Sequence, residues 1–167
     1  MPREVRKSQD ITGSKMKKKD VLFFSIVAIV IILDQITKYF IVKKFEFLQS
    51  KPLITNVLHL TYIQNTGAGF GILQDQTIVL IWLSIIVIGI ILFVYDKIQA
   101  NIQCVFTALI LGGTIGNLID RIRLNYVVDF IDFRIWPAFN VADSALTVGI
   151  FGLLIYFFVV ERKSFKR

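Results

Sequence analysis

Four long apolar runs, separated by shorter polar segments, dominate the pattern of this chain. They cover residues 21–40, 77–95, 102–119 and 142–160. About 20 consecutive apolar residues are needed for an α-helix to cross the hydrocarbon core of a bilayer, and each run comes close to this length. The pattern therefore predicts a membrane protein, mainly α, with four transmembrane helices.

Residues 56–64, between the first two runs, show a different periodicity. Leu58 and Leu60 alternate with His59 and Thr61. A period of two residues is typical of a β-strand with one face buried. We therefore expect a small extracytoplasmic β-sheet between spans one and two.

A second extended segment is predicted just before the fourth span. Residues 127–136 are rich in β-branched and aromatic side chains, which favour strands. Trp136 suits the interface between membrane and water, and Pro137 favours an extended backbone at the preceding residue.

The charge distribution predicts how the chain is oriented in the membrane. The net charge is +7, and much of the basic surplus flanks the first and last spans, at Lys15, Lys17, Lys18 and Lys19 and at Arg162, Lys163, Lys166 and Arg167. Basic residues accumulate on the cytoplasmic side, so both termini are expected there. No basic segment alternates with aromatic residues as in a nucleic-acid-binding surface, so no nucleic-acid partner is expected.

Three regions follow from this pattern. Residues 1–19 are polar and of mixed charge, which predicts a disordered cytoplasmic extension, and either Met1 or Met16 could be the start. Residues 20–161 are expected to form a single membrane domain. Residues 162–167 form a basic cytoplasmic tail.

Polar residues interrupt the outer half of the first span. Asp34 and Lys38 are four residues apart, so they share one face of a helix and can form an ion pair. One interpretation is an ion pair at the membrane interface. The other is that this face of the helix is directed into a polar site within the bundle.

Further polar residues fall at the same side of the membrane when the crossings are counted. They are the glycine-rich segment 65–71, the group Asn117, Asp120 and Arg121, and the pair Asn140 and Asp143. Scattered structural ion pairs would not be expected to gather on one side. Asp143 directly precedes a run without charge, where a carboxylate is costly and indicates a function.

Asp129 adds a second carboxylate on this side, and two carboxylates can carry out acid–base chemistry as a pair. The chain contains one cysteine, Cys104, and one histidine, His59, too few for a typical zinc site. We therefore expect neither a metal nor another cofactor. Two other classes are considered: a small transporter or proton-linked channel, and a membrane adaptor without catalytic activity.

Five motifs in this order resemble the lipoprotein signal peptidase family, also called signal peptidase II. They are residues 34–38 (DQITK), 65–71 (NTGAGFG), 116–121 (GNLIDR), 127–130 (VVDF) and 139–144 (FNVADS). Each motif is weak alone, whereas five in order on four predicted spans are specific. The similarity covers roughly residues 20–160.

The resemblance implies an intramembrane aspartyl endopeptidase that cleaves prolipoproteins before a cysteine carrying diacylglycerol. Its catalytic pair falls on Asp129 and Asp143, and Asp120 is the alternative to Asp129. The supporting polar positions are Asp34, Lys38, Asn65, Gly67, Asn117, Asp120, Arg121 and Asn140.

The expected location is the bacterial inner membrane, with the active site at the extracytoplasmic face. The expected partners are the lipid-modified precursor and membrane lipid, and a monomer is expected.

Overall fold

The computed structural model describes residues 18–68, 72–98 and 101–161. Its elements are, in chain order, α1 (Lys18–Lys44), β1 (Ser50–Ile54), β2 (Leu58–Asn65), α2 (Thr77–Val94), the 3-10 turn η2 (Tyr95–Lys97), α3 (Asn101–Leu124), β3 (Val127–Asp132), α4 (Val141–Tyr156) and the π-helical turn η3 (Phe157–Glu161). The predictions for residues 1–17 and for the basic tail lie outside the described residues, as does the part of the glycine-rich segment at 69–71.

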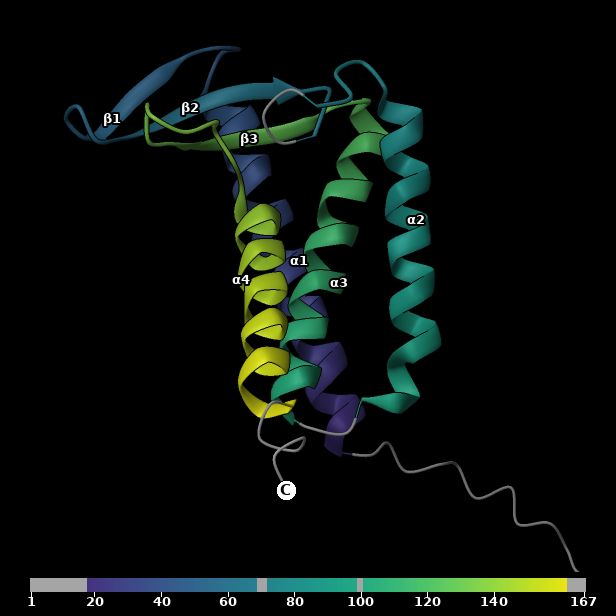
Figure 1. Ribbon diagram of the computed structural model, residues 1–167. Helices are drawn as coiled ribbons and strands as arrows, with labels where there is room; N and C mark the ends of the chain where they lie inside the picture. The colour runs from purple at the N-terminus through teal and green to yellow at the C-terminus, as the bar shows by residue number, and fades with distance from the viewer. Residues whose placement is uncertain (1–17, 69–71, 99–100, 162–167) are drawn as a thin grey trace, which may run out of the picture.

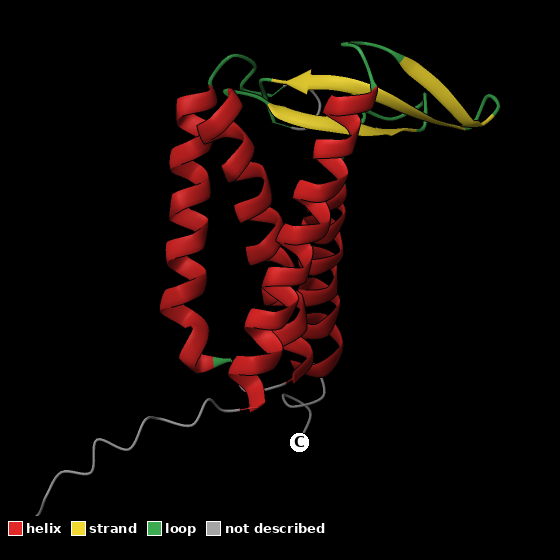
Figure 2. Cartoon of the chain, turned by 180° about the vertical axis from the view of Figure 1, so that it is seen from behind, coloured by secondary structure: helices red, strands yellow, loops and turns green. Residues whose placement is uncertain are grey.

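The helices stand side by side as a bundle, and the sheet covers one end of it (Figures 1 and 2). All four are long and apolar enough to cross a membrane. The start of α1 and the end of η3 lie at the end of the bundle away from the sheet. The prediction of four spans and a small sheet is therefore confirmed.

The sheet has three antiparallel strands in the order β1-β2-β3. The first two strands come from the segment between α1 and α2, as predicted. The third comes from the segment between α3 and α4, so the extended residues 127–132 complete the same sheet. In this register Asp129 lies opposite Ile63 on β2, and Asn65 lies opposite Val127.

Small residues allow α3 to pack closely against its neighbours. A Cβ atom at Gly112 would lie 2.8 Å from the Cβ of Val30 on α1. A Cβ atom at Gly113 would overlap the carbonyl oxygen of Ala142 on α4. The close helix approach expected of small residues in a membrane is therefore used on two sides of α3.

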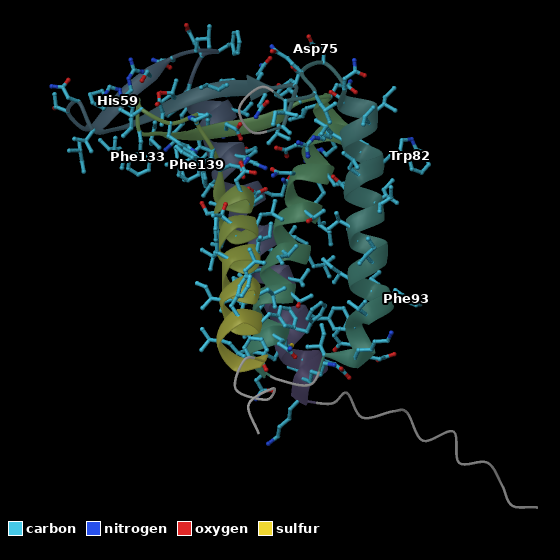
Figure 3. All side chains as sticks on the ribbon, viewed as in Figure 1. His59, Asp75, Trp82, Phe93, Phe133 and Phe139 are labelled. Carbon is cyan, nitrogen blue, oxygen red and sulfur yellow. The ribbon has the colours of Figure 1, made fainter. Side chains whose placement is uncertain are left out.

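The second helix, α2, stands apart from α1 and α4 and packs against α3. Most of its side chains are exposed to the surroundings of the bundle, and Trp82 and Phe93 project outward from it (Figure 3). This agrees with the uniformly apolar sequence of the helix, which suits contact with lipid on most sides.

The glycine contact predicts the effect of one added methyl group. Gly113→Ala should lower the free energy of unfolding by about 1–3 kcal/mol, because the methyl group collides with α4. The control is Gly89→Ala on α2, where a Cβ would meet no described atom within 4 Å beyond its own helical turns. The control should be neutral or stabilising. Thermal unfolding in detergent measures both, and equal melting temperatures for the two variants would contradict this packing.

Candidate active site

The chain reverses direction sharply between α3 and β3. Asn125 has a φ of 64°, a left-handed conformation, and its N–H donates to the carbonyl of Arg121 at 3.1 Å. Asparagine tolerates this conformation better than most residues, so it suits the end of a helix. The reversal brings β3, with Asp129, back alongside the last turn of α3.

The start of α4 is fixed by a capping box. The Asn140 side-chain oxygen accepts from the N–H of Asp143 at 2.9 Å, and the Asn140 N–H donates to Asp143 Oδ2 at 3.2 Å. Such reciprocal bonds satisfy backbone groups that a helix start leaves unpaired. The cap also fixes the Asp143 carboxylate at the positive end of the helix dipole.

Two asparagines connect the carboxyl groups of Asp129 and Asp143. Asn140 Nδ2 donates to Asp129 Oδ1 at 2.7 Å. Asn117 Nδ2 donates to Asp143 Oδ1 at 2.7 Å, and the Asn117 side-chain oxygen accepts from Asn140 at 3.1 Å. The two carboxyl groups therefore belong to one hydrogen-bonded network, although they are 14 positions apart in sequence.

Asp129 is almost completely buried, with 2% of its surface exposed. Burial, followed by the negative charge of Asp143, raises the pKa of Asp129 to about 7 from its ordinary value of 3.8. The amide of Asn65, which donates to Asp129 Oδ2 at 2.8 Å, acts in the opposite direction by stabilising the ionised form. Asp129 is therefore a carboxyl group that can hold a proton near neutral pH.

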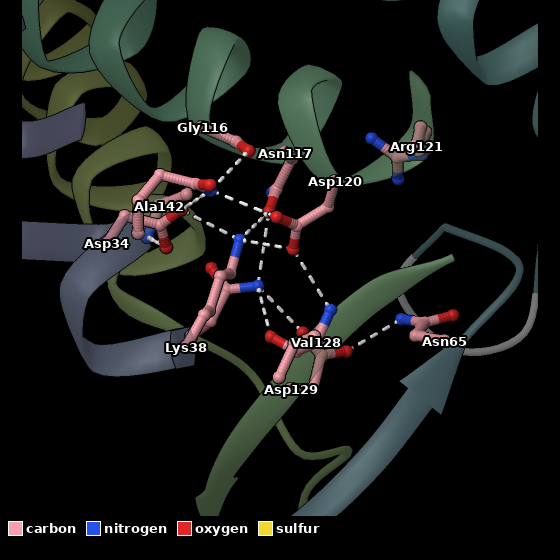
Figure 4. A network of polar contacts seen from close by, with 12 residues as sticks. Asp34, Lys38, Asn65, Gly116, Asn117, Asp120, Arg121, Val128, Asp129 and Ala142 are labelled. Carbon is pink, nitrogen blue, oxygen red and sulfur yellow. Dashed lines mark hydrogen bonds and ion pairs between the residues drawn. The ribbon is translucent and has the colours of Figure 1, made fainter. Parts of the chain in front are cut away.

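A buried cation, Lys38, belongs to the same network through Asn117 (Figure 4). Lys38 Nζ contacts Asp34 Oδ2 at 2.8 Å, Asp120 Oδ2 at 2.9 Å and Asn117 Oδ1 at 3.0 Å. Lys38 is 3% exposed and Asp34 is fully buried. Of the two sequence interpretations of this ion pair, the one that directs it into the bundle is the one that the structure shows.

Asp34 also connects α1 to the start of α4. Its Oδ1 accepts from the N–H of Ala142 at 2.9 Å (Figure 4). Because Ala142 directly precedes Asp143, this bond helps to fix the position of the Asp143 backbone.

Gln35 belongs to the same cluster, although it was not among the predicted site residues. Its amide donates to Gly116 O at 3.2 Å and to Asp120 Oδ1 at 2.9 Å. Consecutive side chains in a helix point about 100° apart, so Gln35 was not expected on the face that Asp34 and Lys38 share. Its place in the polar motif at 34–38 was the only signal in the sequence.

Asp120 and Asp129 have different surroundings. Asp120 binds Lys38 and Gln35, and its Oδ2 accepts from the N–H of Val128 at 3.1 Å. Its oxygens are therefore occupied by structural partners. Asp129, by contrast, lies with Asp143 in the lining of an open cavity, to which Asp120 does not contribute.

This cavity has a volume of about 890 Å³ and lies between the sheet, α3 and α4. Its polar lining includes Asn65, Asn117, Arg121, Asp129 and Asp143. Its apolar lining includes residues of α4, among them Leu146 and Val148, and residues 136–139 of the β3–α4 connection. A polar group and an apolar group attached to it can therefore be held at the same time.

Arg121 anchors the loop that follows β2. Its Nη2 donates to the carbonyl of Gly67 at 3.3 Å, and the Gly67 N–H donates to the side chain of Asn65 at 2.9 Å. A Cβ at Gly67 would lie 3.0 Å from the Ile72 carbonyl, which explains the need for glycine there. All ten predicted site residues thus lie at the sheet end of the bundle. Six of them line the cavity, and the other four, Asp34, Lys38, Asp120 and Asn140, do not.

The buried cluster around Lys38 predicts a large loss of stability when the cation is removed. Lys38→Met leaves two buried carboxylates without their counterion, and should cost about 3–5 kcal/mol of unfolding free energy. Lys43→Met, at the exposed end of the same helix, should change it by less than about 0.5 kcal/mol. Thermal unfolding in detergent compares the two. If the Lys38→Met protein had the same melting temperature as the wild type, a structural role for this cation would be refuted.

A family model and the relatives of this chain name the same family. The family model for signal peptidase (SPase) II matches residues 26–159. A lipoprotein signal peptidase of Halothermothrix orenii is 44% identical over 142 residues, which are 84% of this chain and 98% of that protein. Another, of Caldanaerobacter subterraneus subsp. tengcongensis, is 49% identical over 136 residues, covering 79% and 94% of the two chains.

A solved structure of a bacterial membrane enzyme, obtained by the in meso method at 2.3 Å resolution, has a similar fold. The TM-score is 0.78 at 33% identity, and the match covers 87% of this chain and 91% of that one. The fold, the family model and the relatives agree over nearly the whole membrane domain. The chain therefore belongs to the signal peptidase II family, whose members are aspartic-type peptidases of the bacterial membrane.

Proposed function

We propose that Asp129 and Asp143 act as a catalytic pair that removes the signal peptide from bacterial prolipoproteins. The observation that carries this proposal is the asparagine-bridged pair of carboxyl groups in the lining of one cavity. Two carboxyl groups so placed do not both ionise readily, so the pair holds one proton over a range of pH. A pair with one proton contains both a general base and a general acid.

In the proposed reaction, one water molecule lies between the two carboxyl groups. The ionised carboxyl takes a proton from the water while the water oxygen attacks the scissile carbonyl carbon. The protonated carboxyl donates a hydrogen bond to the carbonyl oxygen. The tetrahedral intermediate then breaks at the C–N bond, and a carboxyl group transfers a proton to the leaving amine. The asparagines hold both carboxyl groups in place throughout.

The cavity also fits the proposed cleavage site, just before a cysteine that carries diacylglycerol. Polar groups for a peptide backbone lie beside the pair, whereas Leu146 and Val148 extend the lining along α4. The side chain of Val148 is 55% exposed on a membrane-spanning helix. An acyl chain attached to the substrate can therefore remain in lipid while the peptide reaches the carboxyl groups.

Orientation and assembly follow from the same features. We place the sheet end at the extracytoplasmic face, because 11 of the 19 lysines and arginines stand in residues 1–20 and 161–167 of the sequence, which adjoin the opposite end of the bundle. The positive-inside rule assigns that end to the cytoplasm. A single chain supplies both carboxyl groups and their donors, which supports a monomer. Membership of a peptidase family argues against the transporter and adaptor alternatives.

Replacement of either carboxyl group tests the proposed pair. Asp129→Asn and Asp143→Asn should each lower the rate of cleavage about 10²–10⁴-fold. Each variant lacks either the base that takes a proton from the water or the acid that bonds the carbonyl oxygen. The measurement uses purified protein with a diacylglyceryl-modified precursor, and mass spectrometry of the product locates the cleaved bond.

The matched control is Asp132→Asn. Asp132 lies on the same strand as Asp129, but it bonds Thr61 and Arg134 and not the members of the pair. This variant should cleave within a few-fold of the wild-type rate. An Asp129→Asn enzyme as active as the control would remove Asp129 from the mechanism. If the wild-type protein cleaved a precursor without diacylglycerol as fast as the modified one, only the proposed substrate would be contradicted, and not the catalytic pair.

The raised pKa of Asp129 predicts the alkaline limb of the pH profile. The active form needs one proton on the pair, so kcat/KM should fall as the pH rises through about 7 and that proton is lost. Asn65→Ala removes a donor that stabilises the ionised Asp129, so its pKa should increase and the limb should move to higher pH.

The control for this shift is Thr66→Val. Thr66 also lines the cavity, but its hydroxyl donates to Asp75 and not to the pair. The limb should keep its midpoint in this variant even if the rate changes. A limb that moves to lower pH in Asn65→Ala would contradict the assignment of that limb to Asp129.

A further inference from the structure

The connection between β3 and α4 exposes an unusual group of apolar side chains. Ile135 is 93% exposed, the highest value for a large apolar residue in the described part of the chain. Trp136 beside it is 58% exposed, and Phe133 is 39% exposed. We refer to residues 133–138 as the aromatic loop. Apolar side chains gathered in this way indicate a contact surface.

The aromatic loop is held in one conformation at both ends. Asp132 accepts from the N–H of Arg134 at 2.8 Å and forms an ion pair with its guanidinium at 3.3 Å. Phe139 pairs with Ile131 through backbone bonds of 2.8 and 3.1 Å, and its ring stacks on that of Phe133 at 6.0 Å. The exposure of Ile135 is therefore a property of an ordered loop.

The position of the loop relative to the spans identifies what covers it. The loop precedes α4, which enters the apolar layer from Val141, and Phe133 and Phe139 lie on the bundle side of the sheet near the start of α4 (Figure 3). Ile135 is only six residues before α4, a distance of at most about 20 Å even for an extended chain. The loop is therefore close enough to the start of the span to reach the level where the bilayer meets water.

Composition and charge match the same surroundings. Tryptophan is enriched at membrane interfaces, where its ring contacts both lipid and water. Arg134, directly before Ile135, presents a side chain that is 53% exposed. Cationic groups beside an apolar tip complement lipid phosphates.

We propose that the aromatic loop is a membrane-docking element, with Ile135 and Trp136 inserted into the bilayer interface. Trp136 and residues 137–139 also line the active-site cavity. Docking would therefore place one wall of the cavity in lipid, so that the cavity opens towards the bilayer. This proposal rests on exposure and position and does not depend on the assignment of the catalytic pair.

Fluorescence of Trp136 tests the proposal directly, because the chain contains only two tryptophans, Trp82 and Trp136. The full chain with Trp82→Phe, in vesicles of phosphatidylcholine and phosphatidylglycerol, reports on Trp136 alone. We expect blue-shifted emission, strong quenching by lipids brominated near the start of the acyl chains, and weak quenching by aqueous acrylamide. Adding Ile135→Asp should shift the emission to the red and at least halve the quenching by brominated lipid.

The control is Trp136→Phe, which reports on Trp82 of α2. Its emission should not change when Ile135→Asp is added. Two results would overturn the proposal. One is a Trp136 that acrylamide quenches and brominated lipid does not. The other is protection of Trp136 from acrylamide only at high protein-to-lipid ratios, which would mean that a second copy of the chain covers the loop.

Discussion

Asp34, Asp120, Asp129 and Asp143 lie together at one end of a membrane bundle, and each carboxylate needs a cation or a hydrogen-bond donor. The structure depends on which groups provide these contacts. Asp34 and Asp120 share Lys38, whereas Asp129 and Asp143 receive amide donors. Among the described residues, every buried side-chain nitrogen and oxygen has a hydrogen-bond partner. An unpaired polar group in such surroundings costs several kcal/mol, so this pairing is a condition for the fold as well as for the chemistry.

The arrangement divides the carboxylates into two pairs with different properties. The pair that shares a lysine is neutralised and holds α1, α3 and the start of α4 together. The pair that shares asparagines lies beside the cavity, and no lysine or arginine contacts either carboxylate at ion-pair distance within the described chain. Amide donors orient the two groups without removing their need for a proton. This difference supports Asp129 and Asp143, and not Asp120, as the catalytic pair.

Much of the fold could be predicted from the sequence, because apolar runs of membrane length and the period of residues 56–64 are local signals. The gathering of polar residues at one end followed from counting crossings. The extended segment at residues 127–136 was also predicted, but its pairing with β2 and the contacts of Gln35 could not be, because they depend on which elements meet in space. Asn140 was predicted as a site residue from its motif. Its hydrogen bond to Asp129 could not be predicted, because that bond depends on the relative positions of β3 and α4.

The central claim is that Asp129 and Asp143 hold one proton between them near neutral pH. Infrared spectroscopy of the protonated carboxyl stretch, followed as a function of pH, measures this most directly. We predict a protonated carboxyl band that disappears with a midpoint near pH 7 in the wild type. In Asp143→Asn the midpoint should move to lower pH, because the neighbouring negative charge is gone. A midpoint that is the same in both proteins would contradict the shared proton.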